Sequence, residues 1–368
     1  MLQLHLALPK GHMFRRLAAT VVVLLLAIGW IQARQDPVPQ IFASPPFEAY
    51  LEPLRRQAGI PGLSAAILLD GEIAWERAYG FQNQEARIRA TPDTPYLVAD
   101  LSQTLAAVLL LQCVEQRRLE LDAPVRRYGL NLPEPSVTMR HLLSHTSTGL
   151  PGSTFLYDPA RFAQLTNLVT TCIPQPYRKS VSHRILEHLA MQDSVPGRDL
   201  QNPAVVPADD YERSQLERYQ RVLERLAVPY RIDKRNRAFR NDLPPEGISA
   251  AAGLVSTVRD LARFDRALDS TLLLDSTRAL AWTNATRSDF SSVPTGLGWF
   301  VQTYRGERIV WHFGLIPNAY SSLILKVPSR RLTLIMLANS DRLSSPFQLH
   351  VGDVTTSVFA SLFLRLAI

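Results

Sequence analysis

Strand-like segments at both ends of the sequence are the feature that most limits how this 368-residue chain can fold. Near the start, two such segments within residues 63–81 meet at Asp70-Gly71, a dipeptide typical of tight hairpin turns. Near the end, four more follow one another within residues 296–339. Their connections 305–307 and 328–330 are too short for helical crossovers, which predicts antiparallel pairing.

Helical periodicity dominates the long middle region, residues 91–280, and predicts shorter helices over Phe47–Gln57 and Thr355–Leu366. A further helix is predicted over Asp210–Ala227. The fold class is therefore α/β (α+β). One antiparallel sheet is built from both ends of the chain, terminal helices pack on it, and a large helical region is inserted between its strands. The cleft between the helical region and the sheet is the natural place for a site.

The N-terminal segment has the pattern of an export signal. Residues 17–31 carry no charge and follow Arg15 and Arg16, which predicts a signal peptide or signal anchor over residues 1–33. The apolar run is short for a full membrane span, and its basic flank argues against a buried core helix. We expect residues 34–46 to be a tether and residues 47–368 to be exported, either periplasmic or membrane-anchored and facing outside.

The charge and the cysteine content indicate which kinds of partner are expected. The formal net charge is +7, and one basic cluster stands out, which we interpret as a solvated loop: Arg231, Lys234, Arg235, Arg237 and Arg240. Because no nucleic-acid module accompanies it, no nucleic-acid partner is predicted. Cys113 and Cys172 lack metal-ligand spacing, and the sequence leaves open whether they form a disulfide. No cofactor or metal is predicted, and the sequence does not set the oligomeric state.

Five stretches of the sequence share a pattern with known enzymes: residues 60–81, 91–100, 114–151, 248–264 and 296–300. From about Gly59 to Asn339 the chain resembles serine β-lactamases of the class C type, penicillin-binding D-alanyl-D-alanine carboxypeptidases and the related esterases. The resemblance implies a β-lactamase/transpeptidase-like fold, which agrees with the architecture inferred from the strand and helix pattern.

The chemistry of that family needs a Ser at the start of a helix and a Lys three residues later. It also uses a Y-x-N motif, a K-T-G or H-x-G strand, and two backbone N–H groups that hold the oxyanion. Here Asp100 stands at the nucleophile position and Gln103 at the Lys position, and no Ser in the sequence is followed three residues later by Lys. Ser102 lies about 200° around the helix from Asp100, so it cannot face the same cleft.

The other motifs survive in part. The resemblance places Tyr157 at the catalytic Tyr, with Asp158 and Pro159 in place of Ser and Asn, and His312-Phe313-Gly314 as the H-x-G strand. It implies catalytic positions at Asp100, Gln103, Tyr157 and His312, and ligand-binding positions at Asp158, Phe313, Gly314 and Leu315, the last as an oxyanion donor. The alternatives are an aromatic wall residue for Tyr157 and a structural residue at a sheet edge for His312.

Three functions follow from this pattern. The favoured one is an exported domain without serine acyl transfer that binds a peptidoglycan-like or other small molecule, or a protein. The second is a hydrolase in which Asp100 acts as general base and His312 or Tyr157 as acid. The third is a structural surface protein. In each case Asp100 suits a helix N-cap, and its charge should raise the pKa of Tyr157.

Overall fold

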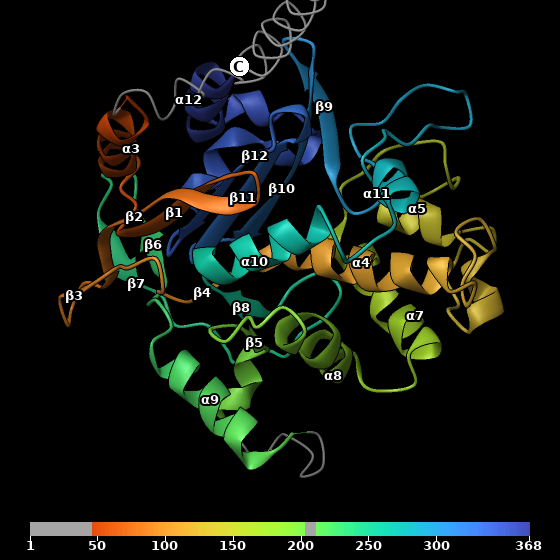
Figure 1. Ribbon diagram of the computed structural model, residues 1–368, viewed down its shortest axis with the longest axis horizontal. Helices are drawn as coiled ribbons and strands as arrows, with labels where there is room; N and C mark the ends of the chain where they lie inside the picture. The colour runs from red at the N-terminus through yellow and green to blue at the C-terminus, as the bar shows by residue number, and fades with distance from the viewer. Residues whose placement is uncertain (1–45, 203–210) are drawn as a thin grey trace, which may run out of the picture.

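The computed structural model describes residues 46–202 and 211–368, so the predicted signal segment and nearly all of the predicted tether lie outside it. A twisted sheet lies at the centre of Figure 1, with the terminal helices on one side and the inserted helical region on the other. Within the described residues, no helix combines the length and the apolar character needed to cross a bilayer.

The central sheet has seven strands in the order β3-β2-β1-β12-β11-β10-β9, and every neighbouring pair is antiparallel. The strands are β1 Gly62–Leu69, β2 Glu72–Asn83, β3 Ile88–Arg89, β9 Phe300–Tyr304, β10 Glu307–Ile316, β11 Tyr320–Val327 and β12 Leu332–Ala338. β1 and β12 are neighbours although they come from opposite ends of the chain. The predicted hairpin, the antiparallel C-terminal strands and the joining of the two chain ends in one sheet are confirmed.

The helices of the described residues are α3 Pro46–Gln57, α4 Ser102–Glu115, α5 Met139–Leu143, α6 Pro159–Ala163, α7 Leu165–Cys172, α8 Tyr177–Val181, α9 Arg213–Glu224, α10 Val258–Leu268, α11 Asp275–Ala281 and α12 Val358–Ala367. The helices predicted at both ends of the domain are present. Between β3 and β9 lie eight of these helices and two small sheets, β4-β8-β5 and β6-β7. Their strands are β4 Tyr96–Leu97, β5 Val195–Pro196, β6 Tyr230–Ile232, β7 Ala238–Arg240 and β8 Leu254–Ser256.

Each face of the sheet buries its own core. Along β11, Leu323 and Leu325 pack into the cluster that contains Phe47 of α3 and Phe363 of α12, whereas Ile324 packs into the cluster of the inserted region. This alternation follows from the two-residue repeat of a strand. Since both faces are covered, β11 and β12 read as nearly continuous apolar runs rather than as alternating ones.

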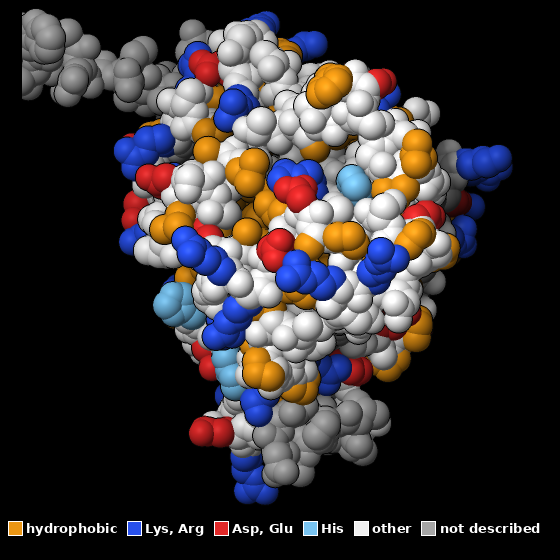
Figure 2. All heavy atoms as spheres, turned by 90° about the vertical axis from the view of Figure 1, so that its right-hand side faces the viewer, with side chains coloured by type: hydrophobic (Ala, Val, Ile, Leu, Met, Phe, Trp, Pro, Cys, Tyr) orange, Lys and Arg blue, Asp and Glu red, His pale blue; other side chains and the backbone are white. Residues whose placement is uncertain are grey.

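The basic cluster is exposed as expected, and Lys234, Arg235 and Arg237 lie in a loop, but Arg231 and Arg240 lie in the short strands β6 and β7 on either side of it. Residues 230–240 form a hairpin in which β6 pairs with β7, and the rings and guanidinium groups of its side chains stack: Arg231 and Arg237 both lie over Phe239. On the face of the molecule drawn in Figure 2, basic and acidic side chains are interspersed rather than gathered into a region of one sign.

The two cysteines form a disulfide. Cys113 near the end of α4 is bonded to Cys172 at the end of α7, with a sequence separation of 59. Both side chains are buried in the core of the inserted region. The bond therefore fixes α7 against the helix that begins beside Asp100.

Candidate active site

Asp100 lies in a tight turn between β4 and α4, directly against the central sheet. The turn is a 3₁₀ segment, Ala99–Leu101, and Ala99 has φ of 52°, a left-handed conformation that is uncommon for a residue with a side chain. Gly314 of β10 packs on this turn, where a Cβ would stand 2.2 Å from the carbonyl oxygen of Val98. Only glycine allows this approach.

The carboxylate of Asp100 is held by backbone N–H groups. Its Oδ2 accepts a hydrogen bond from the N–H of Leu315 at 3.1 Å, and the N–H of Asp100 itself also bonds the carboxylate. The expected N-cap is wrong, because α4 begins only at Ser102 and has no side-chain cap. The carboxylate is drawn instead to the end of β10, where two convergent N–H groups satisfy a buried negative group.

Gln103 is completely buried and joins two aromatic side chains. Its Nε2 donates to the hydroxyl of Tyr157 at 3.2 Å, and its Oε1 lies 3.1 Å from Nε2 of His145. The backbone N–H of Asp158 donates to Nδ1 of His145, so the proton of this ring must be on Nε2. His145 therefore donates to Gln103, and Gln103 donates to Tyr157.

Burial sets the protonation of this cluster. It raises the pKa of Asp100 to about 7, against the lowering effect of the two N–H groups. It raises the pKa of Tyr157 well above the ordinary value, and the charge of Asp100 adds to the effect, as the sequence predicted. Burial also lowers the pKa of His145 to about 3 and that of His312 to about 4. Both rings are therefore neutral at pH 7.

His312 lies just beyond the paired part of β9: the β10–β9 pairing ends at Trp311, so His312 pairs with Ile324 of β11 on one side and lies at an open edge of the sheet on the other. Its Nδ1 lies 2.7 Å from the carbonyl oxygen of Phe313, so Nδ1 carries the proton and donates it to that oxygen. The ring centroids of His312 and Tyr157 are 6.3 Å apart, and those of Phe313 and Tyr157 5.2 Å. Tyr157 thus lies against an aromatic wall as well as beside Gln103.

Residues 47–350, more than four fifths of the chain, match the family model described as Beta-lactamase. The chain belongs to the Beta-lactamase family. Its fold is also that of an octameric penicillin-binding protein homologue from Pyrococcus abyssi, with a TM-score of 0.70 and 21% sequence identity over 87% of this chain and 76% of that one.

Curated relatives match over shorter stretches. The chain is 33% identical to the human serine beta-lactamase-like protein LACTB, mitochondrial, over 26% of this chain and 19% of LACTB. It is 34% identical to esterase EstB of Burkholderia gladioli over 27% of each protein. Protein flp of Staphylococcus aureus is 22% identical over 76% of this chain and 60% of flp. The chain thus spans about a fifth to three fifths of these relatives.

Within this Beta-lactamase-family site, the structure brings Asp100, Gln103, Tyr157, His312 and Leu315 together. Asp158 is used differently, since its Oδ1 accepts from the N–H of Arg161 and caps α6. Ser102 is buried away from the cluster, where its hydroxyl donates to the carbonyl oxygen of Ala99. Phe313 and Gly314 serve packing and the close approach of the turn.

Sequence reasoning did not single out His145, although it lies in the most specific of the family-like stretches, residues 114–151. His145 lies just after the end of α5 and has φ of 55°. The sequence does not reveal this backbone conformation, so it gave no sign that the ring lies beside Gln103. Among residues 46–202 and 211–368, no group of three or more His, Cys, Asp or Glu side chains is arranged to hold a metal ion.

Proposed function

We propose that this chain is an exported Beta-lactamase-family protein that has lost serine acyl transfer and retains a ligand-binding role. The observation that carries the proposal is the hydrogen bond from Leu315 N–H to the Asp100 carboxylate. The resemblance implies that, in the family, the backbone N–H groups at positions 100 and 315 bind the oxyanion of the reacting carbonyl. Here they hold a side chain of the protein itself, at the position where the nucleophile would stand.

The residue at the Lys position supports the same conclusion. A catalytic Lys must provide a charge or a lone pair that takes the proton of the nucleophile. Gln103 offers an amide, and both ends of that amide are bound, to Tyr157 and to His145. Tyr157 in turn keeps its proton, because its pKa is raised well above the ordinary value. Neither side chain can act as a base near pH 7.

A hydrolase with altered chemistry is the second candidate, and one observation favours it. Burial brings the pKa of Asp100 to about 7, which suits a general base at neutral pH. Its acid partners do not fit, because the pKa of His312 is lowered to about 4 and that of Tyr157 is raised well above its ordinary value. A water-activating Asp100 would therefore lack an acid able to protonate the leaving group.

The first prediction is that the wild-type protein forms no covalent adduct with a penicillin or a fluorophosphonate. Without Ser at position 100, neither reagent meets a nucleophile at the start of α4. Intact-mass spectrometry measures the adduct, and melting curves on the same samples measure binding. A rise in melting temperature with penicillin and without turnover would support a binding role for the site.

Tyr157→Phe and His312→Gln variants locate any binding. A stoichiometric adduct on residues 99–115 of the wild-type protein would contradict the loss of acyl transfer. Ester hydrolysis that rises with pH through about 7 and is absent in Asp100→Asn would instead establish the altered hydrolase.

Export is supported by two independent features. The uncharged segment 17–31 follows Arg15-Arg16, and the chain forms the Cys113–Cys172 disulfide, a bond typical of oxidising compartments. We expect an alkaline phosphatase fused after residue 40 to be active in bacterial cells. A fusion with Arg15 and Arg16 replaced by Glu is the control. A stable but inactive fusion of the native segment would contradict export.

A further inference from the structure

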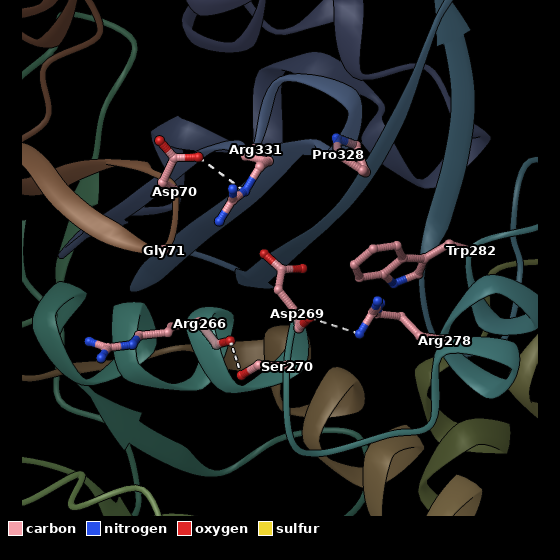
Figure 3. A pocket seen from close by; sticks show the side chains of 9 residues that line it. All are labelled: Asp70, Gly71, Arg266, Asp269, Ser270, Arg278, Trp282, Pro328 and Arg331. Carbon is pink, nitrogen blue, oxygen red and sulfur yellow. Dashed lines mark hydrogen bonds and ion pairs between the residues drawn. The ribbon is translucent and has the colours of Figure 1, made fainter. Parts of the chain in front are cut away.

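A cavity of about 490 Å³ lies remote from Asp100, at the opposite end of the central strands. The β1–β2 turn, the end of α10, α11 and the β11–β12 connection enclose it, as Figure 3 shows. Gly314 at the active site pairs with Ser322 of β11, and β11 reaches the cavity only near Pro328. This length of strand separates the two places by about 20 Å. The cavity has the volume of a small-molecule site.

Three arginines and two aspartates line the cavity. Arg331 pairs with Asp70 at 3.0 Å, and the backbone N–H of Asp70 also bonds the carbonyl oxygen of Arg331, which joins the two turns. Asp269 is paired with the buried Lys326 at 3.0 Å, and this ion pair already neutralises its charge. Arg266 and Arg278 pair with carboxylates that do not line the cavity, and both of those carboxylates are largely exposed.

Exposed ion pairs contribute little and leave their cations available to a ligand. Unlike the other two arginines of the cavity, Arg278 is largely buried. Its side chain is only 19% exposed, and its guanidinium donates a hydrogen bond to the carbonyl oxygen of Asp269 at 2.9 Å. It is therefore held in place at the end of α10. A fixed guanidinium binds carboxylate or phosphate oxygens at little cost in side-chain entropy.

Trp282 provides an independent sign of a missing acceptor. It is only 6% exposed, lines the cavity, and has an Nε1–H without a hydrogen-bond partner in the described part of the chain. Figure 3 shows the indole nitrogen on the ring edge that faces Arg278. The guanidinium carbon lies 5.8 Å from the ring centroid. An unpaired buried donor is costly, and a ligand oxygen between these two groups would satisfy it.

We propose that this cavity binds a small organic anion whose carboxylate or phosphate group lies between Trp282 Nε1–H and Arg278, with Arg331 at the rim. The volume exceeds what an inorganic ion fills, so the remainder of the ligand packs against the Trp282 ring and Pro328. The site is separate from the proposed active site and does not depend on the function proposed for it.

The indole N–H resonances of the full chain test the proposal directly, because the sequence has only five tryptophans. Phenyl phosphate, benzoate, inorganic phosphate and the neutral benzyl alcohol are titrated at constant ionic strength. Trp282→Phe assigns the Trp282 resonance. We expect phenyl phosphate or benzoate to move that resonance selectively and saturably, and benzyl alcohol to leave it in place. The better of the two anions identifies the phosphate or the carboxylate as the group bound.

Arg278→Gln should weaken the binding about tenfold or more, as expected for loss of the charge-assisted hydrogen bond to the anion, and a melting curve checks that the variant is folded. Exposed Arg126, which does not line the cavity, gives the matched control Arg126→Gln, which should bind as wild type. Calorimetry with Trp282→Phe should show the same weakening. Equal movement of all five resonances, or affinity unchanged in both Arg278→Gln and Trp282→Phe, would overturn the proposal.

Discussion

The double variant Asp100→Ser, Gln103→Lys is expected to become acylated slowly by a penicillin or a reactive ester, with little turnover. The substitution rebuilds the S-x-x-K pattern across the 3₁₀ turn at Asp100 and the first turn of α4, where both positions already lie beside Tyr157. Serine at position 100 removes the carboxylate from Leu315 N–H, and this N–H and that of residue 100 become available to an oxyanion. Acylation requires fewer positioned groups than deacylation, because deacylation also needs a positioned water.

The hydrogen-bond order around Gln103 determines how the new Lys behaves. His145 Nδ1 is occupied by the Asp158 N–H, so the ring presents Nε2–H to position 103. An ammonium there would face another donor, whereas a neutral amine accepts from it. Complete burial at this position also favours the neutral amine. The new Lys is thus expected to be a base for the introduced serine rather than a permanent cation beside Tyr157.

Time-resolved intact mass of the wild type, both single variants and the double variant measures this result. We expect an adduct on the double variant alone, because Ser without a base and a base without Ser are both inert. Adding Tyr157→Phe to the double variant shows whether the hydroxyl takes part. A folded double variant that remains free of adduct after hours would show that the cleft itself no longer admits the reagents.

The sheet could be predicted from the sequence because its signals are local. Asp70-Gly71 fixes a hairpin, and the short connections 305–307 and 328–330 leave antiparallel pairing as the only choice. The hairpin of the basic cluster was missed because only three residues on each side pair, and stacking of Arg231 and Arg237 on Phe239 supports it. Such pairing leaves little periodicity in the sequence.

The site was predictable as a set of positions but not as a set of interactions. Family resemblance brought Asp100, Gln103, Tyr157 and His312 together. The preference of Asp for helix N-caps then suggested that Asp100 caps its helix. In the folded protein the left-handed conformation of Ala99 instead directs the carboxylate to the N–H of Leu315. The neutral state of His312 likewise depends on its burial against the rings of Tyr157 and Phe300, which no local pattern shows.

The substitution Asp100→Asn is expected to stabilise the protein at pH 8. The wild-type carboxyl has its pKa raised from an ordinary value of about 4 to about 7 by burial, so the folded state resists its ionisation. Asn keeps an oxygen for Leu315 N–H and carries no charge. A shift of about three pKa units corresponds to a ceiling of about 4 kcal/mol in the free energy of unfolding, and we expect a gain of about 2 kcal/mol or more.

The sign of the pH dependence distinguishes this cause from a general packing effect. A raised pKa in the folded state means that the contribution of Asp100 to stability is fully present below about pH 4 and is lost as pH rises to about 7. The gain from Asn should therefore be near zero at about pH 4, grow through this window and be constant above about pH 8. Asp260, His145 and His312 also titrate abnormally, but they are present in both proteins and cancel in the difference.

Urea unfolding of the wild type and Asp100→Asn at pH 4, 6 and 8 measures the difference. Asp122→Asn is the matched control, because a hydrogen bond from Arg140 lowers the pKa of Asp122 and its loss should leave the protein no more stable at any pH. An Asp100→Asn protein that is less stable than wild type at pH 8 would show that Leu315 and Asp100 stabilise the fold through the charge itself. A gain that appears with rising pH instead means that the chain keeps a destabilising carboxylate at its former nucleophile position, as proteins do at functional sites, and this favours a retained role in binding over a purely structural one.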